Sequence, residues 1–223
     1  MTVRSSLENG FPLMTRVPLV AATRNSDKLA LLTRMAGQRH ELRPLSVADE
    51  ADEPAVGERI GSDPLVENAT AKAMFVSAAL AGARTIASDG GLLVPGLGND
   101  WQPARTRRFA GPGATNRERA EALLRLAAEL TGDQRQIGWR EAVAIAEAGR
   151  LIATFTAEAS PGWLGESLSA GWDDDGQKFW VPRLWLSNRG DPRVSPGADT
   201  DHWDRLALLV APFLDGLAMR PAL

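Results

Sequence analysis

Short apolar runs alternate with amphipathic segments in the first third of the chain. Residues 17–22 form an apolar run typical of a buried strand, and a polar turn follows it. Apolar residues then recur at helical spacing up to Gly37, which predicts a helix with Asn25 as its N-cap. Residues 41–45 indicate an edge strand because they contain proline, and residues 64–80 indicate an alanine-rich helix.

Helical and strand-like patterns continue to the end of the chain. Amphipathic spacing predicts helices over residues 115–130 and 201–217. Residues 136–146 and 150–159 resemble two strands of a hairpin, and an aromatic strand is expected over 179–186 after a loop at 160–175. Strands that alternate with helices, followed by a hairpin, favour an α/β protein with a mixed sheet.

One acidic residue stands between two apolar runs. Residues 85–94 read Thr-Ile-Ala-Ser-Asp-Gly-Gly-Leu-Leu-Val, so Asp89 is followed by two glycines. Asp-Gly is a common turn pair, and the simple interpretation is a β-turn between two strands. The alternative is a functional carboxylate presented at that break, because glycine lets backbone approach a ligand closely.

Composition excludes several classes of protein. The 223 residues include no cysteine, which excludes disulfides and thiolate chemistry. A net charge of −3 gives no electrostatic footprint for nucleic acid, and no apolar run is long enough for a transmembrane helix. Residues 1–16 lack the apolar core of a signal peptide and are expected to be an N-terminal extension. We expect a cytoplasmic protein that binds neither nucleic acid nor membrane.

Positive charge gathers at two predicted helices. Lys28 lies in the first turn of the helix after Asn25, where backbone N–H groups favour an anion, although a solvated lysine at an ordinary strand–helix connection would look the same. Asn68 and Lys72 are four residues apart and therefore share a helix face. The acidic segment 49–63 contains carboxylates that suit a hard cation, although most such residues are merely solvated.

Three motifs together resemble the inosine/xanthosine triphosphate pyrophosphatase family. Its Ala-Thr-x-Asn-x-x-Lys pattern is complete at residues 22–28, and its Glu-Asn-Ala-x-x-Lys-Ala pattern is complete at residues 67–73. The family's Ala-Asp-Asp-Ser-Gly-Leu stands here as Ala-Ser-Asp-Gly-Gly-Leu at residues 87–92. The second aspartate is kept as Asp89, whereas Ser88 and Gly90 depart from the motif.

The C-terminal half resembles the family less. A Gly-aromatic-Asp loop is matched at residues 171–173 if three residues are inserted before the aromatic strand. A rival alignment places Trp180 and Val181 on the aromatic-Asp pair and deletes that aspartate. The family's Ser-His-Arg reads Asp-His-Trp at residues 201–203, so its arginine is lost.

The resemblance implies a fold, a reaction and a set of roles. It implies a single domain over residues 1–223, with a long mixed β-sheet flanked by helices, two lobes with a central cleft, and a homodimer. It implies Mg²⁺-dependent hydrolysis of a nucleoside triphosphate, such as inosine or xanthosine triphosphate, to a monophosphate and pyrophosphate. Asp89 would be the catalytic base. The remaining roles are metal binding by Glu58 and Asp89; phosphate binding by Thr23, Asn25, Lys28, Asn68 and Lys72; and base binding by Trp172, Asp173 and His202.

Two other functions remain open at this point. The altered motifs would also suit a diverged enzyme on the same fold that acts on or binds another nucleotide or phosphorylated metabolite. A non-catalytic scaffold is the third possibility, and the intact lysine motifs count against it.

Overall fold

The structure is a computed structural model, and it describes residues 16–45, 63–80, 83–168, 179–187 and 201–219. Three of the residues assigned a role above, Glu58, Trp172 and Asp173, lie outside these ranges, as do the expected N-terminal extension up to residue 15 and most of the acidic segment. In the described ranges, no helix is long and apolar enough to cross a bilayer.

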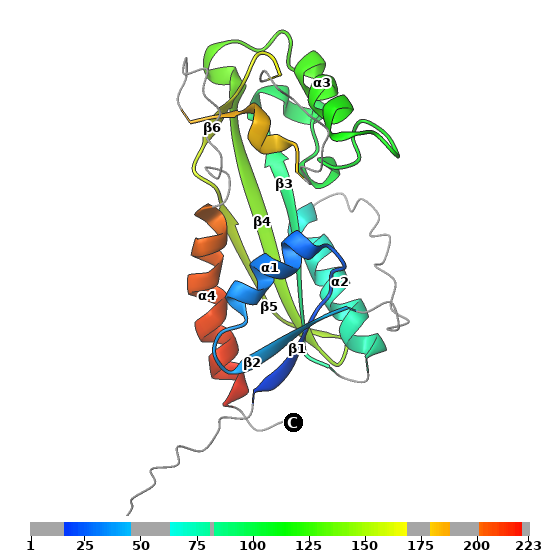
Figure 1. The fold of residues 1–223 in the computed structure, drawn as a ribbon, viewed down its shortest axis with the longest axis vertical. Helices are drawn as coiled ribbons and strands as arrows, with labels where there is room; N and C mark the ends of the chain where they lie inside the picture. The colour runs from blue at the N-terminus through cyan, green and yellow to red at the C-terminus, as the bar shows by residue number, and fades with distance from the viewer. Residues whose placement is uncertain (1–15, 46–62, 81–82, 169–178, 188–200, 220–223) are drawn as a thin grey trace, which may run out of the picture.

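A long mixed sheet runs through the molecule (Figure 1). Its strands follow the order β2-β1-β3-β4-β6-β7, and β5 pairs with β4. β1 is parallel to both β2 and β3, whereas the pairs β3–β4, β4–β5, β4–β6 and β6–β7 are antiparallel. The bounds are β1 Val17–Ala21, β2 His40–Pro44, β3 Thr85–Leu93, β4 Gln136–Glu147, β5 Arg150–Glu158, β6 Gly162–Leu164 and β7 Trp185–Leu186.

Helices cover both faces at one end of the sheet, and α3 lies at the other end (Figure 1). Their bounds are α1 Ser26–Met35, α2 Pro64–Ala79, α3 Asn116–Leu126 and α4 Asp201–Ala218. Side chains alternate between faces along a strand, so Ile86 packs with α1 and α4 while its neighbour Ala87 packs with α2. A third apolar cluster, which contains Leu92 and Trp139, joins α3 to the far end of β3 and β4. The α/β mixed sheet expected from the sequence is confirmed.

Side-chain caps explain where three of the helices begin. Asn25 accepts the N–H groups of Asp27 and Lys28 at the start of α1, as the sequence predicts. Asp63 caps α2 through the N–H of Leu65, and Thr115 and Glu118 form a capping box on α3. The hydrogen bond from the Thr115 backbone lowers the pKa of Glu118.

The predicted turn at Asp89 is wrong. β3 continues through residues 88–91 without a break, and each residue from Thr85 to Leu93 has a partner on β4. Both glycines are needed because the neighbours are close: a Cβ on Gly91 would lie 2.2 Å from the carbonyl oxygen of Pro103. The glycines therefore make room for neighbouring groups and do not turn the chain.

The C-terminal half also differs from the sequence-based expectation. Most of the predicted aromatic strand is a 3₁₀ turn, η4 Val181–Leu184, and only Trp185–Leu186 form a strand. Pro182 has no N–H for a strand ladder, which favours the turn. The described part of the predicted 160–175 loop contains β6, whose Gly162 lies against the Trp185 indole, so that a Cβ would be 2.1 Å from its Nε1. The helix predicted to reach residue 130 ends at Leu126.

We expect Arg135→Met to lower the free energy of unfolding by about 3 kcal/mol, because several buried carbonyls would lose their donor. The Arg135 side chain is buried and donates to the carbonyl oxygens of Ala127, Leu130, Leu164 and Gly165 at 2.6 to 3.3 Å. Urea denaturation measures the loss. Arg125→Met, at an exposed position of α3, is the matched control, and an equal effect of both variants would contradict the prediction.

Stability is expected to fall as the pH drops below about 6.5, in part through His40. Burial and then the Arg84 guanidinium lower the pKa of His40 from 6.5, against the opposing effect of Asp215. Because the folded-state pKa is the lower one, the unfolded chain takes up this proton first as the pH falls. His40→Gln should therefore show a smaller loss of stability between pH 7.5 and 5.5, measured by denaturant unfolding. Equal losses in both proteins would contradict it.

Candidate functional site

Asp89 is held by two side chains of α2. The Lys72 Nζ lies 2.8 Å from Asp89 Oδ1, and the Asn68 Nδ2 donates to Oδ2 at 2.9 Å. The side chains of Lys72 and Asp89 are 17% and 15% exposed, so the ion pair is mostly shielded from water yet still accessible. The structure thus brings together the carboxylate and the shared helix face that the sequence predicts.

Each oxygen of a carboxylate has two lone pairs, so these bonds leave acceptor capacity at Asp89. The carboxylate is fixed from one side by α2 and keeps a position for a further donor or cation. A group held in this way is pre-organised, because its rotamer is set before any ligand binds.

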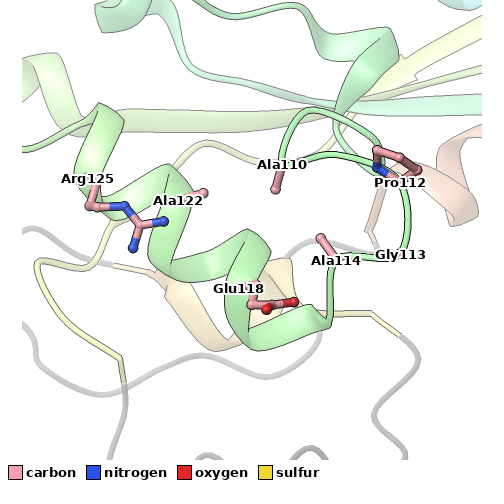
Figure 2. Close-up of a pocket in the computed structure, with 7 residues that line it drawn as sticks. All are labelled: Ala110, Pro112, Gly113, Ala114, Glu118, Ala122 and Arg125. Carbon is pink, nitrogen blue, oxygen red and sulfur yellow. The ribbon is translucent and has the colours of Figure 1, made fainter.

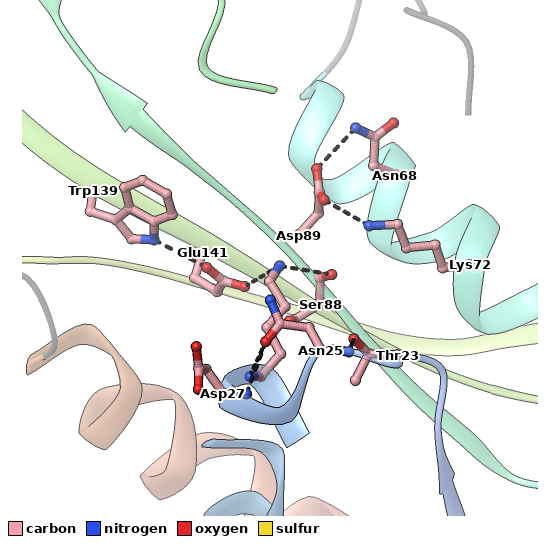
Figure 3. A network of polar contacts seen from close by, with 10 residues as sticks. Thr23, Asn25, Asp27, Asn68, Lys72, Ser88, Asp89, Trp139 and Glu141 are labelled. Atoms are coloured by element: carbon pink, nitrogen blue, oxygen red, sulfur yellow. Dashed lines mark hydrogen bonds and ion pairs between the residues drawn. The ribbon is translucent and has the colours of Figure 1, made fainter. Parts of the chain in front are cut away.

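The turn between β1 and α1 is ordered by its own polar residues (Figure 3). The Asn25 N–H donates to Thr23 Oγ1 at 3.1 Å, and Asn25 Oδ1 accepts the N–H groups of Asp27 and Lys28 at 2.9 and 3.3 Å. Asn25 therefore occupies two of the helix N–H groups that the sequence suggested for an anion. The dipole of α1 still favours negative charge at this end.

Lys28 reaches from α1 to β3 and β4. Its Nζ lies 3.3 Å from the carbonyl oxygen of Ser88 and 3.4 Å from Glu141 Oε1. Glu141 in turn accepts the Trp139 Nε1 at 3.1 Å. Lys28 thus contacts Ser88, the residue immediately before Asp89, and approaches β3 from the face opposite to α2.

Figure 3 shows Asp89 directed toward α2 while Glu141 and the Ser88 carbonyl lie toward the α1 turn. β1 pairs with β3 only up to Ile86, whose carbonyl oxygen accepts the Ala22 N–H. Further along β3, the Leu92 N–H donates to Thr106 Oγ1. The edge of β3 between these points faces the carboxyl end of the parallel strand β1, a location where α/β sheets bind ligands.

Three residues near the site, Trp139, Arg140 and Glu141, carry no motif in the sequence. Glu141 stands in a strand of buried residues and has no motif around it, so only its charge within an apolar run signalled a special role. Arg140 lies on the α2 face, where its guanidinium is 2.5 Å from the carboxylate of Asp63, the N-cap of α2. The positions of Glu141 and Arg140 near Asp89 follow from the pairing of β4 with β3, which the sequence alone does not reveal.

The base-binding prediction is only partly covered by the described residues. His202 is buried in the first turn of α4, with its ring centroid 5.5 Å from that of Trp203. The two other residues predicted to contact a base, Trp172 and Asp173, are outside the described ranges. The contact of His202 with a base stays a prediction.

The Asp89 carboxylate is a hard oxygen donor of the kind that a magnesium ion takes. In the described residues, no group of three His, Cys, Asp or Glu side chains is placed to hold a metal. Mg²⁺ does not require one, because it is usually bound by one or two carboxylates together with waters and substrate phosphates. Asp89 supplies one such carboxylate, and the predicted second, Glu58, lies outside the described ranges.

A shallow surface hollow on α3 offers no comparable set (Figure 2). Its charged lining residues are Glu118 and Arg125, and Glu118 is engaged in the capping box with Thr115. The hollow is therefore a feature of the α3 N-terminus, separate from the Asp89 site.

The fold resembles solved structures over almost its whole length. A HAM1 protein from Coxiella burnetii has a TM-score of 0.67 at 20% identity and covers 90% of this chain and 99% of that chain. The Ham1 protein of Staphylococcus aureus has a TM-score of 0.67 at 19% identity, with 90% and 99% covered. A nucleoside-triphosphatase / dITP/XTP pyrophosphatase from Mycobacterium abscessus has a TM-score of 0.61 at 20% identity, with 92% and 100% covered.

No curated protein sequence matches the chain. The family model described as "Ham1 family" matches residues 19–175, which include the Lys28, Lys72 and Asp89 motifs. The motifs, the fold and the family match agree, and the chain belongs to the Ham1 family.

Proposed function

We propose that this protein is a Mg²⁺-dependent nucleoside triphosphate pyrophosphatase. It hydrolyses inosine, deoxyinosine or xanthosine triphosphate to the monophosphate and pyrophosphate. The observation that carries the proposal is the setting of Asp89 on β3. Lys72 and Asn68 hold its carboxylate, and Lys28 donates to the carbonyl oxygen of the preceding residue, Ser88.

In this proposal, the two lysines and the turn before α1 bind the phosphates. A triphosphate carries several negative charges, and Lys28 and Lys72 present ammonium groups from opposite sides of β3. Asn25 keeps its amide Nδ2 as a donor because its Oδ1 is used in capping α1. Thr23 orders this turn, and Asn68 holds Asp89 from α2.

Asp89 would orient a water molecule and accept its proton as the water attacks phosphorus. The reaction adds one water across the anhydride bond between the α- and β-phosphates, and pyrophosphate leaves. Lysine ammonium groups stabilise the negative charge that develops on the bridging oxygen. Catalysis of this kind depends mainly on positioning and electrostatics, which the fixed Asp89 carboxylate suits.

Asp89 and Glu58 would hold the magnesium ion, which when bound supplies further positive charge to the phosphates. Trp172 would stack on the base, and Asp173 and His202 would contact its edge. The likeness to the M. abscessus protein supports a purine triphosphate substrate, because that protein is described as a dITP/XTP pyrophosphatase. We further propose that the chain acts as one domain, in the cytoplasm, and as a homodimer.

The first test is pyrophosphate release from inosine, xanthosine and the standard triphosphates, with and without Mg²⁺. We expect turnover that requires Mg²⁺ and favours inosine or xanthosine triphosphate. Asp89→Asn should lower kcat by about 10²-fold or more, because it removes the proton acceptor while keeping the side-chain shape.

Asp100→Asn, an exposed position outside the site, is the matched control and should keep wild-type rates. If the wild-type protein released no pyrophosphate from any of the triphosphates, the proposal would be wrong.

A second candidate is a diverged enzyme with another phosphorylated substrate. Ser88 and Gly90, which replace two polar positions of the family motif, favour it because they lie in β3 beside Asp89. A thermal-shift screen across nucleotides distinguishes the two, since selective stabilisation by inosine triphosphate would exclude the second candidate.

A further inference from the structure

Glu141 is a buried carboxylate with no role in the function proposed above. It is 1% exposed and lies on β4, directly opposite Gly90 in the β3–β4 register. Burial of a carboxylate is costly unless it is paired and hydrogen-bonded. In the described part of the chain, its partners are the Lys28 ammonium at 3.4 Å and the Trp139 indole N–H at 3.1 Å.

Gly90 provides the space that Glu141 occupies. A Cβ on Gly90 would lie 1.8 Å from Glu141 Oε2 and 2.7 Å from its Cδ. No side chain at position 90 is compatible with the carboxylate in this place. Gly90 and Glu141 are therefore a matched pair. Glycine replaces the motif's serine at position 90, and the buried glutamate on β4 fills the space that a side chain there would need.

Ser88 lies on the same face of the sheet as Glu141. It is two residues before Gly90 on β3, and side chains two apart on a strand share a face. The family motif has an aspartate at position 88, so it places a carboxylate on this face of β3. This chain has lost that carboxylate from β3 and carries one on β4 instead.

We propose that Glu141 is a positioning residue of the candidate site, a buried carboxylate that acts through Lys28. It takes over the negative charge that Ser88 has lost and holds the Lys28 ammonium against the edge of β3. The inference rests on the proposed function in one respect, which is that Lys28 contacts the substrate phosphates.

The geometry explains why such a residue matters. A lysine side chain has four rotatable bonds and loses considerable entropy when it is held in one place. The bonds from Lys28 to Glu141 and to the Ser88 carbonyl fix its ammonium group before a substrate arrives. A phosphate that pulled Lys28 away would leave Glu141 as an unpaired buried charge, so the substrate binds where Lys28 already lies.

The test is a double-mutant cycle on KM with four proteins: wild type, Glu141→Gln, Lys28→Met and the double variant. Glutamine keeps the shape and an acceptor for Trp139 but loses the charge. Glu141→Gln should raise KM about 5-fold, the effect of weakening one partly buried ion pair, and change kcat by less than about twofold. In the Lys28→Met background the same substitution should change KM by less than about twofold, because the ammonium group that Glu141 positions is absent.

Glu147→Gln is the matched control, since Glu147 also lies on β4 and pairs with a cation, Arg84, but far from Asp89. It should leave KM unchanged. Equal effects of Glu141→Gln in both backgrounds, or none in wild type, would overturn the proposal.

Rescue tests the exchange of the carboxylate between strands. Ser88→Asp in the Glu141→Gln background returns the charge to β3 on the same face, and KM should fall back toward the wild-type value. A folded Ser88→Asp/Glu141→Gln protein with no recovery of KM would show that Glu141 does not replace the lost carboxylate.

Thermal unfolding separates this inference from the proposed function. Lys28→Met leaves Glu141 buried without its cation, so it should lower Tm more than Lys28→Met/Glu141→Gln, which removes both charges. This comparison needs no substrate and does not depend on the folding of Glu141→Gln alone. If wild type showed no hydrolysis but this order of Tm held, the pairing would stand and the proposed function would fail; the reverse order of Tm would overturn the pairing itself.

Discussion

The register between β3 and β4 is the constraint on which the site depends. Nine consecutive residue pairs, from Thr85–Ala146 to Leu93–Gly138, fix which face each side chain takes. A slip of one residue would move Asp89 to the α1 face and Ser88 to the α2 face. Lys72 would then have no carboxylate to meet, and Gly90 would no longer stand opposite Glu141.

This register gives the site two separate ion pairs on opposite faces of one sheet. Lys72–Asp89 faces α2, and Lys28–Glu141 faces α1. Each lysine is charge-compensated before a ligand binds, which limits the cost of keeping cations in a partly buried place. The sheet keeps the two pairs on separate faces, and both lie where β3 extends beyond its pairing with β1.

The sequence was informative where chemistry is local. Asn25 and Thr115 cap helices through contacts within three residues, and Asn68 and Lys72 share a face by helical spacing alone. The family motifs then added the partner, Asp89. The fold class followed from the alternation of strands and helices.

Predictions failed where distant neighbours decide the structure. Asp-Gly-Gly favours a turn when considered alone, yet pairing with β4 keeps it extended, and the space at Gly90 is taken by a residue 51 positions later in the chain. Glu141 could not be recognised for the same reason, since its partners Lys28 and Gly90 are distant in sequence. The short strand β6 needs Gly162 against the Trp185 indole, a contact that no local pattern reveals.

β3 and β4 also join the two ends of the molecule. Ile86 and Val143 belong to the core beneath α1 and α4, whereas Leu92 and Trp139 on the same strands belong to the core beneath α3. Asp89 and Glu141 lie between these two cores. Three paired strands cross this level, because β5 still pairs with β4 at Glu141 and Ala142. The candidate site therefore lies on the short length of sheet that links the two cores, and a substitution there would act on the packing of both.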